Sequence, residues 1–151
     1  MPKVRCSQRS CATKPQQTQC SGICYYNQVG YLSHYYKILQ SSDNLPLQKQ
    51  RFDFKDDLTE THTYIYDSSG LLSFVVCRSE EDSLMYKMQY SYDDKGNLLQ
   101  ESKMNAFDQE TESRLYTYDD SNRLILMLEY NWNPRYGGIP NLRKHCEYSY
   151  E

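Results

Sequence analysis

The sequence predicts an all-β protein, an antiparallel up-and-down meander of hairpin repeats that forms a curved or twisted open sheet behind a poorly ordered N-terminal arm. Three observations lead to this prediction. Tyr, which favours strands over helices, occurs 16 times in 151 residues. A Tyr-x-Tyr-Asp motif recurs at intervals of 26 residues. The chain also lacks the long apolar run of a transmembrane helix and the periodicity of a helical bundle.

Residues 1–24 form a basic, cysteine-rich segment that contains no Asp or Glu and no apolar stretch of the signal-peptide type. Its content of Gln, Ser, Thr and Pro predicts a disordered arm. The cysteine spacing matches a zinc site only weakly, and two local disulfides are the alternative in an exported protein. The candidate metal ligands in this arm are Cys6, Cys11, Cys20 and Cys24.

Residues 25–60 are expected to form degenerate strands or a cap ahead of the clear repeats. Strand-like patterns cover residues 31–39 and 47–54, and a turn is expected at Lys55-Asp56-Asp57. The strand that follows this turn, residues 59–66, leads into the first repeat.

Residues 61–151 are predicted to form β-hairpin repeats. Tyr-x-Tyr places two aromatic rings on one face of a strand, because side chains alternate between the faces. Asp then opens a turn with its side-chain oxygen, and Gly or Asn three residues later tolerates a left-handed backbone. These residues mark the repeat and are also its candidate binding surface: Tyr64, Tyr66, Asp67, Gly70, Tyr90, Tyr92, Asp93, Gly96, Tyr116, Tyr118, Asp119 and Asn122.

A return strand is expected after each turn, over residues 71–76, 98–102 and 124–128. Polar connections then lead to the next hairpin, at residues 79–83, 105–112 and 131–138. A partial fourth copy, Tyr148-Ser149-Tyr150-Glu151, is expected to supply the last strand. We therefore expect seven or eight strands in all.

The pattern Tyr-x-Tyr-Asp-x-x-Gly-x-Leu, clearest at residues 90–98, resembles the YD repeats of the Rhs family. This family includes bacterial Rhs toxin-delivery proteins, wall-associated proteins and the teneurins. The resemblance covers residues 61–151 and implies strands of a sheet that spirals into a shell, which encloses a toxin or presents a binding surface. The chain has about three and a half repeats and lacks the family's Asp-Pro-x-Gly core motif, so neither shell closure nor self-cleavage is expected.

The sequence indicates no catalytic site and no cofactor. His62 is interpreted as a strand surface residue, and the adjacent His145 and Cys146 point to opposite faces of a strand, which is poor geometry for a nucleophile and its base. Cys77 and Cys146 are expected to be small buried residues. The Asp pairs that open the turns at 93 and 119 are interpreted as turn caps rather than calcium ligands.

These observations predict a non-enzymatic structural or interaction module, resembling part of a YD-repeat shell in a bacterial envelope or secreted protein. A carbohydrate-binding module that uses ladders of Tyr and a small immunity or partner protein are the alternatives. The partner is expected to be another protein, or further repeats, at an exposed sheet edge. The net charge of −3 gives no sign of nucleic-acid binding. The resemblance implies an exported protein without a recognisable signal peptide, and a cytoplasmic location stays open.

Overall fold

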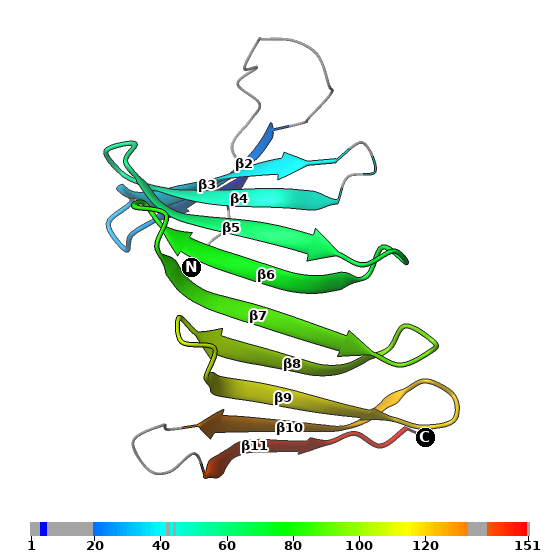
Figure 1. Ribbon diagram of the computed structural model, residues 1–151. Coiled ribbons are helices and arrows are strands. Elements are labelled where there is room, and N and C mark those ends of the chain that lie inside the picture. The colour runs from blue at the N-terminus through cyan, green and yellow to red at the C-terminus, as the bar shows by residue number, and fades with distance from the viewer. Residues whose placement is uncertain (1–3, 6–19, 42, 44, 133–138, 151) are drawn as a thin grey trace. The chain divides into compact units, whose positions relative to one another are not determined.

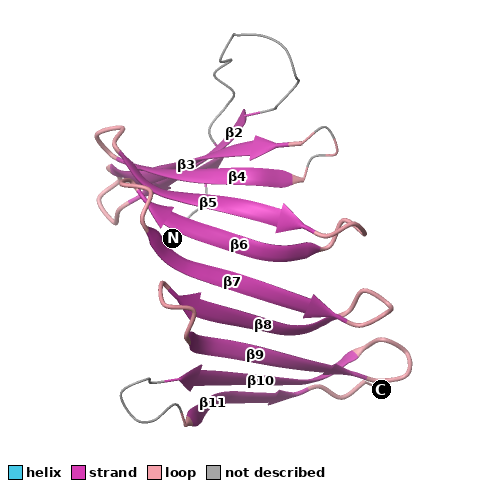
Figure 2. Ribbon diagram, in the orientation of Figure 1, coloured by secondary structure: helices cyan, strands magenta, loops and turns pink. Residues whose placement is uncertain are grey.

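The computed structural model describes Val4–Arg5, residues 20–41, Asp43, residues 45–132 and residues 139–150 (Figure 1). These residues contain eleven strands and no helix (Figure 2). The strand order in the sheet follows the order in the chain, and the paired strands are antiparallel. The strands are β1 Val4–Arg5, β2 Cys20–Tyr26, β3 Leu32–Gln40, β4 Pro46–Asp53, β5 Leu58–Tyr66, β6 Leu72–Ser79, β7 Leu84–Tyr92, β8 Leu98–Asn105, β9 Glu110–Tyr118, β10 Leu124–Trp132 and β11 Pro140–Glu147.

The predicted all-β antiparallel meander is confirmed, but the expected number of strands is too low. The prediction omitted β1 and β2. The strand expected around His145 and Cys146 is β11. The predicted N-terminal arm falls mostly on residues 1–3 and 6–19, which lie outside the described residues. Its last part, from Cys20 onward, belongs to β2.

The chain divides into two compact units. The first contains the residues up to Tyr64 together with Val76–Leu84, and the second contains Ile65–Val75 together with Met85–Glu151. This division differs from the one expected from the repeats, because the β5–β6 hairpin contributes to both units. Residues 25–60 carry strands of the same length and pairing as the later repeats.

One turn geometry closes eight successive hairpins among the described residues. In each turn the N–H of the first residue donates to the carbonyl four residues later, as Asp93 does to Asn97 over 3.0 Å. Gly96 then donates back to the carbonyl of Asp93 over 3.0 Å, and its φ is 85°. The predicted turn with a left-handed Gly or Asn three residues after Asp is therefore confirmed. The eight turns begin at Asn27, Ser41, Asp53, Asp67, Ser79, Asp93, Asn105 and Asp119.

The turn positions extend the 26-residue period beyond the motif that the sequence displays. Turns that begin at 41, 67, 93 and 119 alternate with turns that begin at 27, 53, 79 and 105, and each series has steps of 26. The second series has no Tyr-x-Tyr mark. Its signal is an Asn, Asp or Ser that opens the turn and a Gly or Asp at the left-handed position three residues later, such as Asp82 with φ 61°.

One predicted connection and the fourth motif copy need correction. The turn at Asn105 ends at Gln109 and β9 begins at Glu110, so this connection is shorter than the expected 105–112. The fourth motif copy, residues 148–150, follows the end of β11 and has no strand assignment. The third connection falls largely on residues 133–138, which lie outside the described residues.

Burial is shallow in both units. Among the described residues only Val75, Cys77, Ser102 and Ser113 are buried, and most other strand residues are half-buried. A sheet with neither face covered leaves even its central side chains in contact with water. The backbone ladder and the turns therefore carry a larger share of the stability here than in a layered domain.

The left-handed turn position provides a stability test. A Cβ added at Gly96 meets no atom within 4 Å, so a substitution there introduces backbone strain without a clash. We expect Gly96→Ala to lower the free energy of unfolding by roughly 1–2 kcal/mol, the cost of a left-handed backbone for an ordinary residue. Gly96→Asn should cost less, since Asn122 occupies the equivalent position with φ 60°. Urea unfolding of both variants measures the difference, and equal losses would contradict the strain argument.

Candidate functional site

The turn residues of the predicted binding surface have a clear structural role. Oδ1 of Asp93 accepts hydrogen bonds from the backbone N–H groups of Lys95 at 2.9 Å and Asn97 at 2.8 Å. Asp67 and Asp119 make the same pair of bonds in their own turns. The side-chain hydrogen bond from Asn97 and the backbone N–H donors hold the pKa of Asp93 below its ordinary value. The interpretation of these residues as turn caps is confirmed.

In three of the four motif copies, the second Tyr ties consecutive repeats together. The hydroxyl of Tyr92 donates to the carbonyl of Leu72 at 3.0 Å, in the repeat before it. Tyr118 makes the equivalent bond to Leu98 at 3.0 Å, and Tyr150 donates to the carbonyl of Leu124 at 2.8 Å. Each acceptor is the Leu with which the return strand of the preceding repeat begins. This repeated geometry explains why Tyr and Leu recur together in the sequence.

The first Tyr of the third motif copy donates to a side chain and not to a backbone carbonyl. The hydroxyl of Tyr116 donates to Oε1 of Glu101 at 3.0 Å, on the face where Glu101 also meets Arg114. Burial, followed by the charge of Glu101, raises the pKa of Tyr116 to about 12. All six motif tyrosines, Tyr64, Tyr66, Tyr90, Tyr92, Tyr116 and Tyr118, are half-buried.

The Tyr ladder of the carbohydrate-binding alternative would need equivalent tyrosines on adjacent strands. Each repeat contributes two strands, so β8 lies between β7 and β9, which carry equivalent tyrosines. Strands spaced about 4.8 Å apart put such rings roughly 10 Å apart, beyond the usual range of ring contact. The ring pairs found among the described residues instead join Tyr25, His34, Tyr35, Tyr36 and Phe52 in the first unit.

Strands β9–β11 have two chemically different faces. On one face, Nη1 of Arg114 lies 2.6 Å from Oε1 of Glu101 and Nε lies 2.9 Å from Oε2 of Glu129. The register puts Leu115 opposite Leu128, and Tyr130 opposite Leu142, on the other face. On β11 this face also carries His145, opposite Leu128, and Glu147, opposite Leu126. Leu115 is 37% exposed and Leu142 is 48% exposed. We call Leu115, Leu126, Leu128, Tyr130 and Leu142 the apolar patch.

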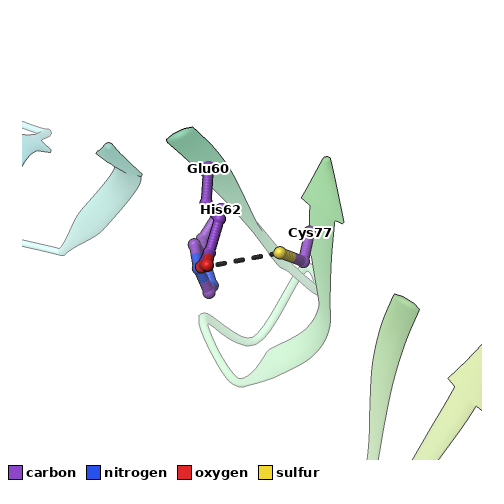
Figure 3. A group of neighbouring side chains, drawn as sticks. All are labelled: Glu60, His62 and Cys77. Carbon is purple, nitrogen blue, oxygen red and sulfur yellow. Dashed lines mark hydrogen bonds and ion pairs between the residues drawn. The ribbon is translucent and has the colours of Figure 1, made fainter. Parts of the chain in front are cut away.

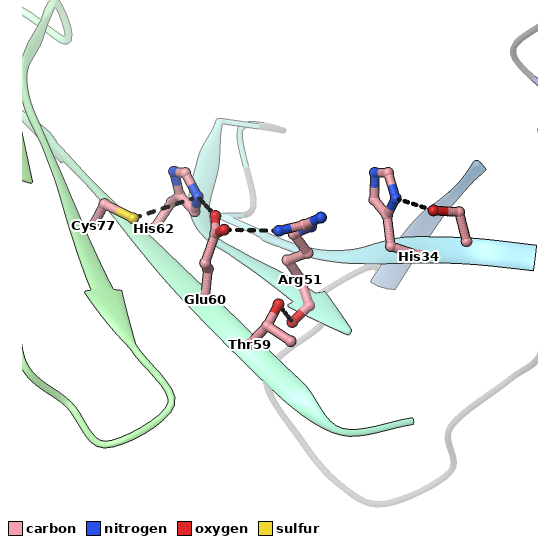
Figure 4. Close-up of polar contacts among 7 residues, drawn as sticks. His34, Arg51, Thr59, Glu60, His62 and Cys77 are labelled. Carbon is pink, nitrogen blue, oxygen red and sulfur yellow. Dashed lines mark hydrogen bonds and ion pairs between the residues drawn. The ribbon is translucent and has the colours of Figure 1, made fainter. Parts of the chain in front are cut away.

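A polar cluster occupies one face of the first unit (Figure 4). Glu60 and His62, two residues apart on β5, point to the same side and meet Cys77 of β6. Nε2 of His62 lies 3.2 Å from Oε2 of Glu60 and 3.7 Å from Sγ of Cys77. Arg51 on β4 donates from Nη1 to Oε1 of Glu60 at 2.8 Å. Burial alone would raise the pKa of Glu60, but the hydrogen bonds from His62 and Arg51 outweigh it and lower that pKa.

Sequence reasoning missed this cluster. It interpreted His62 as a surface residue and Cys77 as a buried one, and the burial of Cys77 is confirmed. The Glu-x-His spacing predicts a shared face, but the strand register decides that Cys77 stands beside it. Cys146 is only half-buried, which differs from the expectation.

The other two histidines lie on β3 and β11. His34 stacks on Tyr25 with ring centroids 4.6 Å apart, and burial, then the charge of Arg51, lowers its pKa. His145 pairs with Glu147 at 3.1 Å on the exposed strand β11. Of the N-terminal candidate metal ligands, Cys6 and Cys11 lie outside the described residues, as does the side chain of Cys20, while Cys24 is half-buried on β2. A zinc site in the arm stays a prediction.

Comparison with known proteins leaves the family open. No family model matches the chain, and no curated protein matches it. Among solved structures, the chain is similar to the crystal structure of a protein of unknown function from Bacteroides fragilis, with 15% sequence identity and a TM-score of 0.31, over 87% of this chain and 94% of that one. Among the described residues, no helix is long and apolar enough to cross a membrane.

The hydrogen bond between repeats can be tested by removing one hydroxyl. Tyr118→Phe deletes the donor to the Leu98 carbonyl, and we expect the free energy of unfolding to fall by about 0.5–1.5 kcal/mol. Tyr148→Phe is the matched control, because Tyr148 is 42% exposed and its side chain makes no hydrogen bond with the described residues. Denaturant unfolding measures both variants. If Tyr148→Phe lowered the free energy of unfolding as much as Tyr118→Phe, the role assigned to the Tyr118 hydroxyl would be refuted.

The raised pKa of Tyr116 predicts a loss of stability in alkali. Its pKa is about 12 in the fold against 10.0 for the ordinary side chain, so the folded state holds this proton more tightly. The resulting stability is fully present below pH 10 and disappears as the pH rises toward 12. Unfolding measured on either side of pH 10 should therefore show a smaller alkaline loss in Tyr116→Phe than in the parent. An unchanged pH dependence would refute the linkage.

Proposed function

We propose that the chain is a non-catalytic structural or interaction module, of the kind that the YD-repeat resemblance implies, and that it acts by packing against another protein. The observation that carries this proposal is the contrast between the two faces of β9–β11. One face carries the Glu101–Arg114–Glu129 ion pairs, and the other bears the apolar patch, bordered on β11 by the His145–Glu147 pair. An amphipathic sheet normally buries its apolar face against a second layer, and no helix or second sheet covers the patch among the described residues.

The exposed strand edge is a weaker candidate for contact than the apolar patch. Strand β11 is the last in the sheet order and begins with Pro140, and it carries the adjacent cations Arg143 and Lys144. Proline removes a backbone donor, and cationic side chains discourage another strand from pairing. The partner is therefore expected to meet the face of the sheet. Pairing with further repeats at this edge stays a prediction.

The carbohydrate-binding alternative has less physical support. Several aromatic faces in this chain are already covered by its own cations: Nζ of Lys49 lies 3.9 Å from the ring centroid of Tyr36, and the guanidinium of Arg123 lies 4.7 Å from that of Tyr150. A sugar that stacks on these rings would have to displace those contacts. A glycan-array signal that Tyr92→Ala and Tyr118→Ala both abolish would favour the carbohydrate function instead.

The experiment compares two sets of variants in the full chain. The chain is co-expressed with the products of the genes that flank its own, and co-purification is measured. Leu115→Glu and Leu142→Glu place charges on the apolar patch and should abolish co-purification. Met85→Glu is the control, because Met85 is also a large apolar residue, 44% exposed, but lies on β7 away from the patch.

Thermal unfolding of the same variants separates binding from folding. Because the substituted residues are exposed, all three variants should unfold within a few degrees of the parent. A parent chain that co-purifies with no flanking product and sediments as a monomer would count against the proposal. The proposal would also fail if Met85→Glu disrupted co-purification as strongly as the two patch variants.

A further inference from the structure

The strongest unassigned chemistry in the molecule is the convergence of Glu60, His62 and Cys77 (Figure 3). Each residue offers one ligand atom, and the three atoms all lie within 4.8 Å of one another. The arrangement follows from the strands: Glu60 and His62 share a face of β5 through the two-residue period, and Cys77 stands on β6, the next strand in the sheet. The three residues belong to the same compact unit.

The geometry is poor for nucleophilic catalysis. In a nucleophile–His–acid relay, the two ring nitrogens divide the work, one facing the nucleophile and the other the carboxylate. Here Sγ of Cys77 and Oε2 of Glu60 both approach Nε2 of His62. One nitrogen cannot both donate to the carboxylate and accept from the thiol. Cys77 is also fully buried, at 0% exposure, so a bulky electrophile has no route to its sulfur.

The same convergence is the geometry of a metal site. A thiolate, an imidazole and a carboxylate are the three side-chain groups that bind Zn²⁺, at about 2.3 Å for sulfur and about 2.0–2.2 Å for nitrogen and oxygen. A tetrahedron with these bond lengths separates its ligand atoms by roughly 3.3–3.6 Å. The separations of 3.2 Å and 3.7 Å around Nε2 are close to these values, and the carboxylate oxygen and the sulfur, which lie within 4.8 Å of each other, need to approach by about 1 Å at most. The thiolate also selects zinc over magnesium and calcium, which prefer oxygen.

We propose that Glu60, His62 and Cys77 bind a Zn²⁺ ion that ties β5 to β6. The thiol of Cys77 releases its proton on binding, so the thiolate and the carboxylate together balance the charge of the ion. Water completes the fourth position on the side where the side chains of His62 and Glu60 are 14% and 23% exposed. This site goes beyond the proposed interaction function, and the failure of either proposal leaves the other standing.

The residues around the site support the ligands. Arg51 holds Oε1 of Glu60 at 2.8 Å and leaves Oε2 directed at the imidazole. Thr59 donates from Oγ1 to the carbonyl of Arg51 at 3.2 Å. This bond joins β4, which carries Arg51, to β5, which carries Glu60. Such outer contacts orient a ligand and typically change metal affinity by about 10–100-fold when they are removed. Arg51 is therefore a positioning residue for the site.

The test uses Co²⁺ as a spectroscopic substitute for Zn²⁺ in the full-length chain. The four N-terminal cysteines, Cys6, Cys11, Cys20 and Cys24, are first replaced by Ser so that only Cys77 and Cys146 remain. Titration of this background with Co²⁺ should saturate at one ion per chain. A thiolate-to-cobalt charge-transfer band should appear, and an equivalent of Zn²⁺ should bleach it.

Variants in that background decide the outcome. Cys77→Ser should abolish the charge-transfer band, and the matched control Cys146→Ser should retain it. His62→Gln and Glu60→Gln keep the buried thiol and should each weaken Co²⁺ binding at least as much as Arg51→Gln, for which roughly a 10-fold loss is expected. These two variants decide the matter if circular dichroism shows that Cys77→Ser has not folded. The proposal is overturned if the background chain gives no band, if Cys77→Ser keeps it, or if His62→Gln and Glu60→Gln bind Co²⁺ as tightly as the background.

Discussion

A hydrogen-bonded turn five residues long sets the register on which the rest of the structure depends. In its complete form, the side-chain oxygen of the first residue accepts two backbone N–H groups, and the fourth residue has a left-handed backbone, as at Asp67 and Gly70. The two strands that flank such a turn have a register shift beside it, such as the shift between Ser91 and Tyr92 next to the turn at Asp93. Because a one-residue slip moves every side chain of a strand to the opposite face, the turn decides which residues meet.

The regular turns explain how a chain with so little buried aliphatic surface keeps its strands in order. The second Tyr of one repeat reaches the Leu carbonyl of the repeat before it at Tyr92 and Tyr118, which are 26 residues apart, and again at Tyr150 after a longer connection. A Tyr can do this because its ring covers apolar sheet surface while its hydroxyl reaches a backbone acceptor. The Tyr of the motif therefore meets a requirement of the repeat, since the described residues form no second layer that could bury Leu or Ile.

In both proposals, the strand register decides which side chains lie together. In β9–β11 the register gathers Leu115, Leu126, Leu128, Tyr130 and Leu142 on the face opposite the Arg114 ion pairs, and we propose that another protein covers them. In the first unit the register brings Glu60, His62 and Cys77 together on one face. Neither arrangement uses the repeat motif itself, whose Asp, Gly and second Tyr are occupied in turns and backbone hydrogen bonds. Function in this chain is therefore expected at positions that vary between the repeats.

The sequence alone determined the all-β class, the 26-residue period and the turn chemistry at Asp67, Asp93 and Asp119, because these follow from contacts within a few residues. It also anticipated that Cys77 would be buried. The second series of turns, including those at Asn27 and Ser79, was hidden because Asn, Asp and Ser are common in any polar loop. The juxtapositions of Cys77 with His62, and of Leu115 with Leu128, were decided only by the tertiary structure. They join different strands, and the pairing register that brings such residues together depends on all the turns and bulges between them.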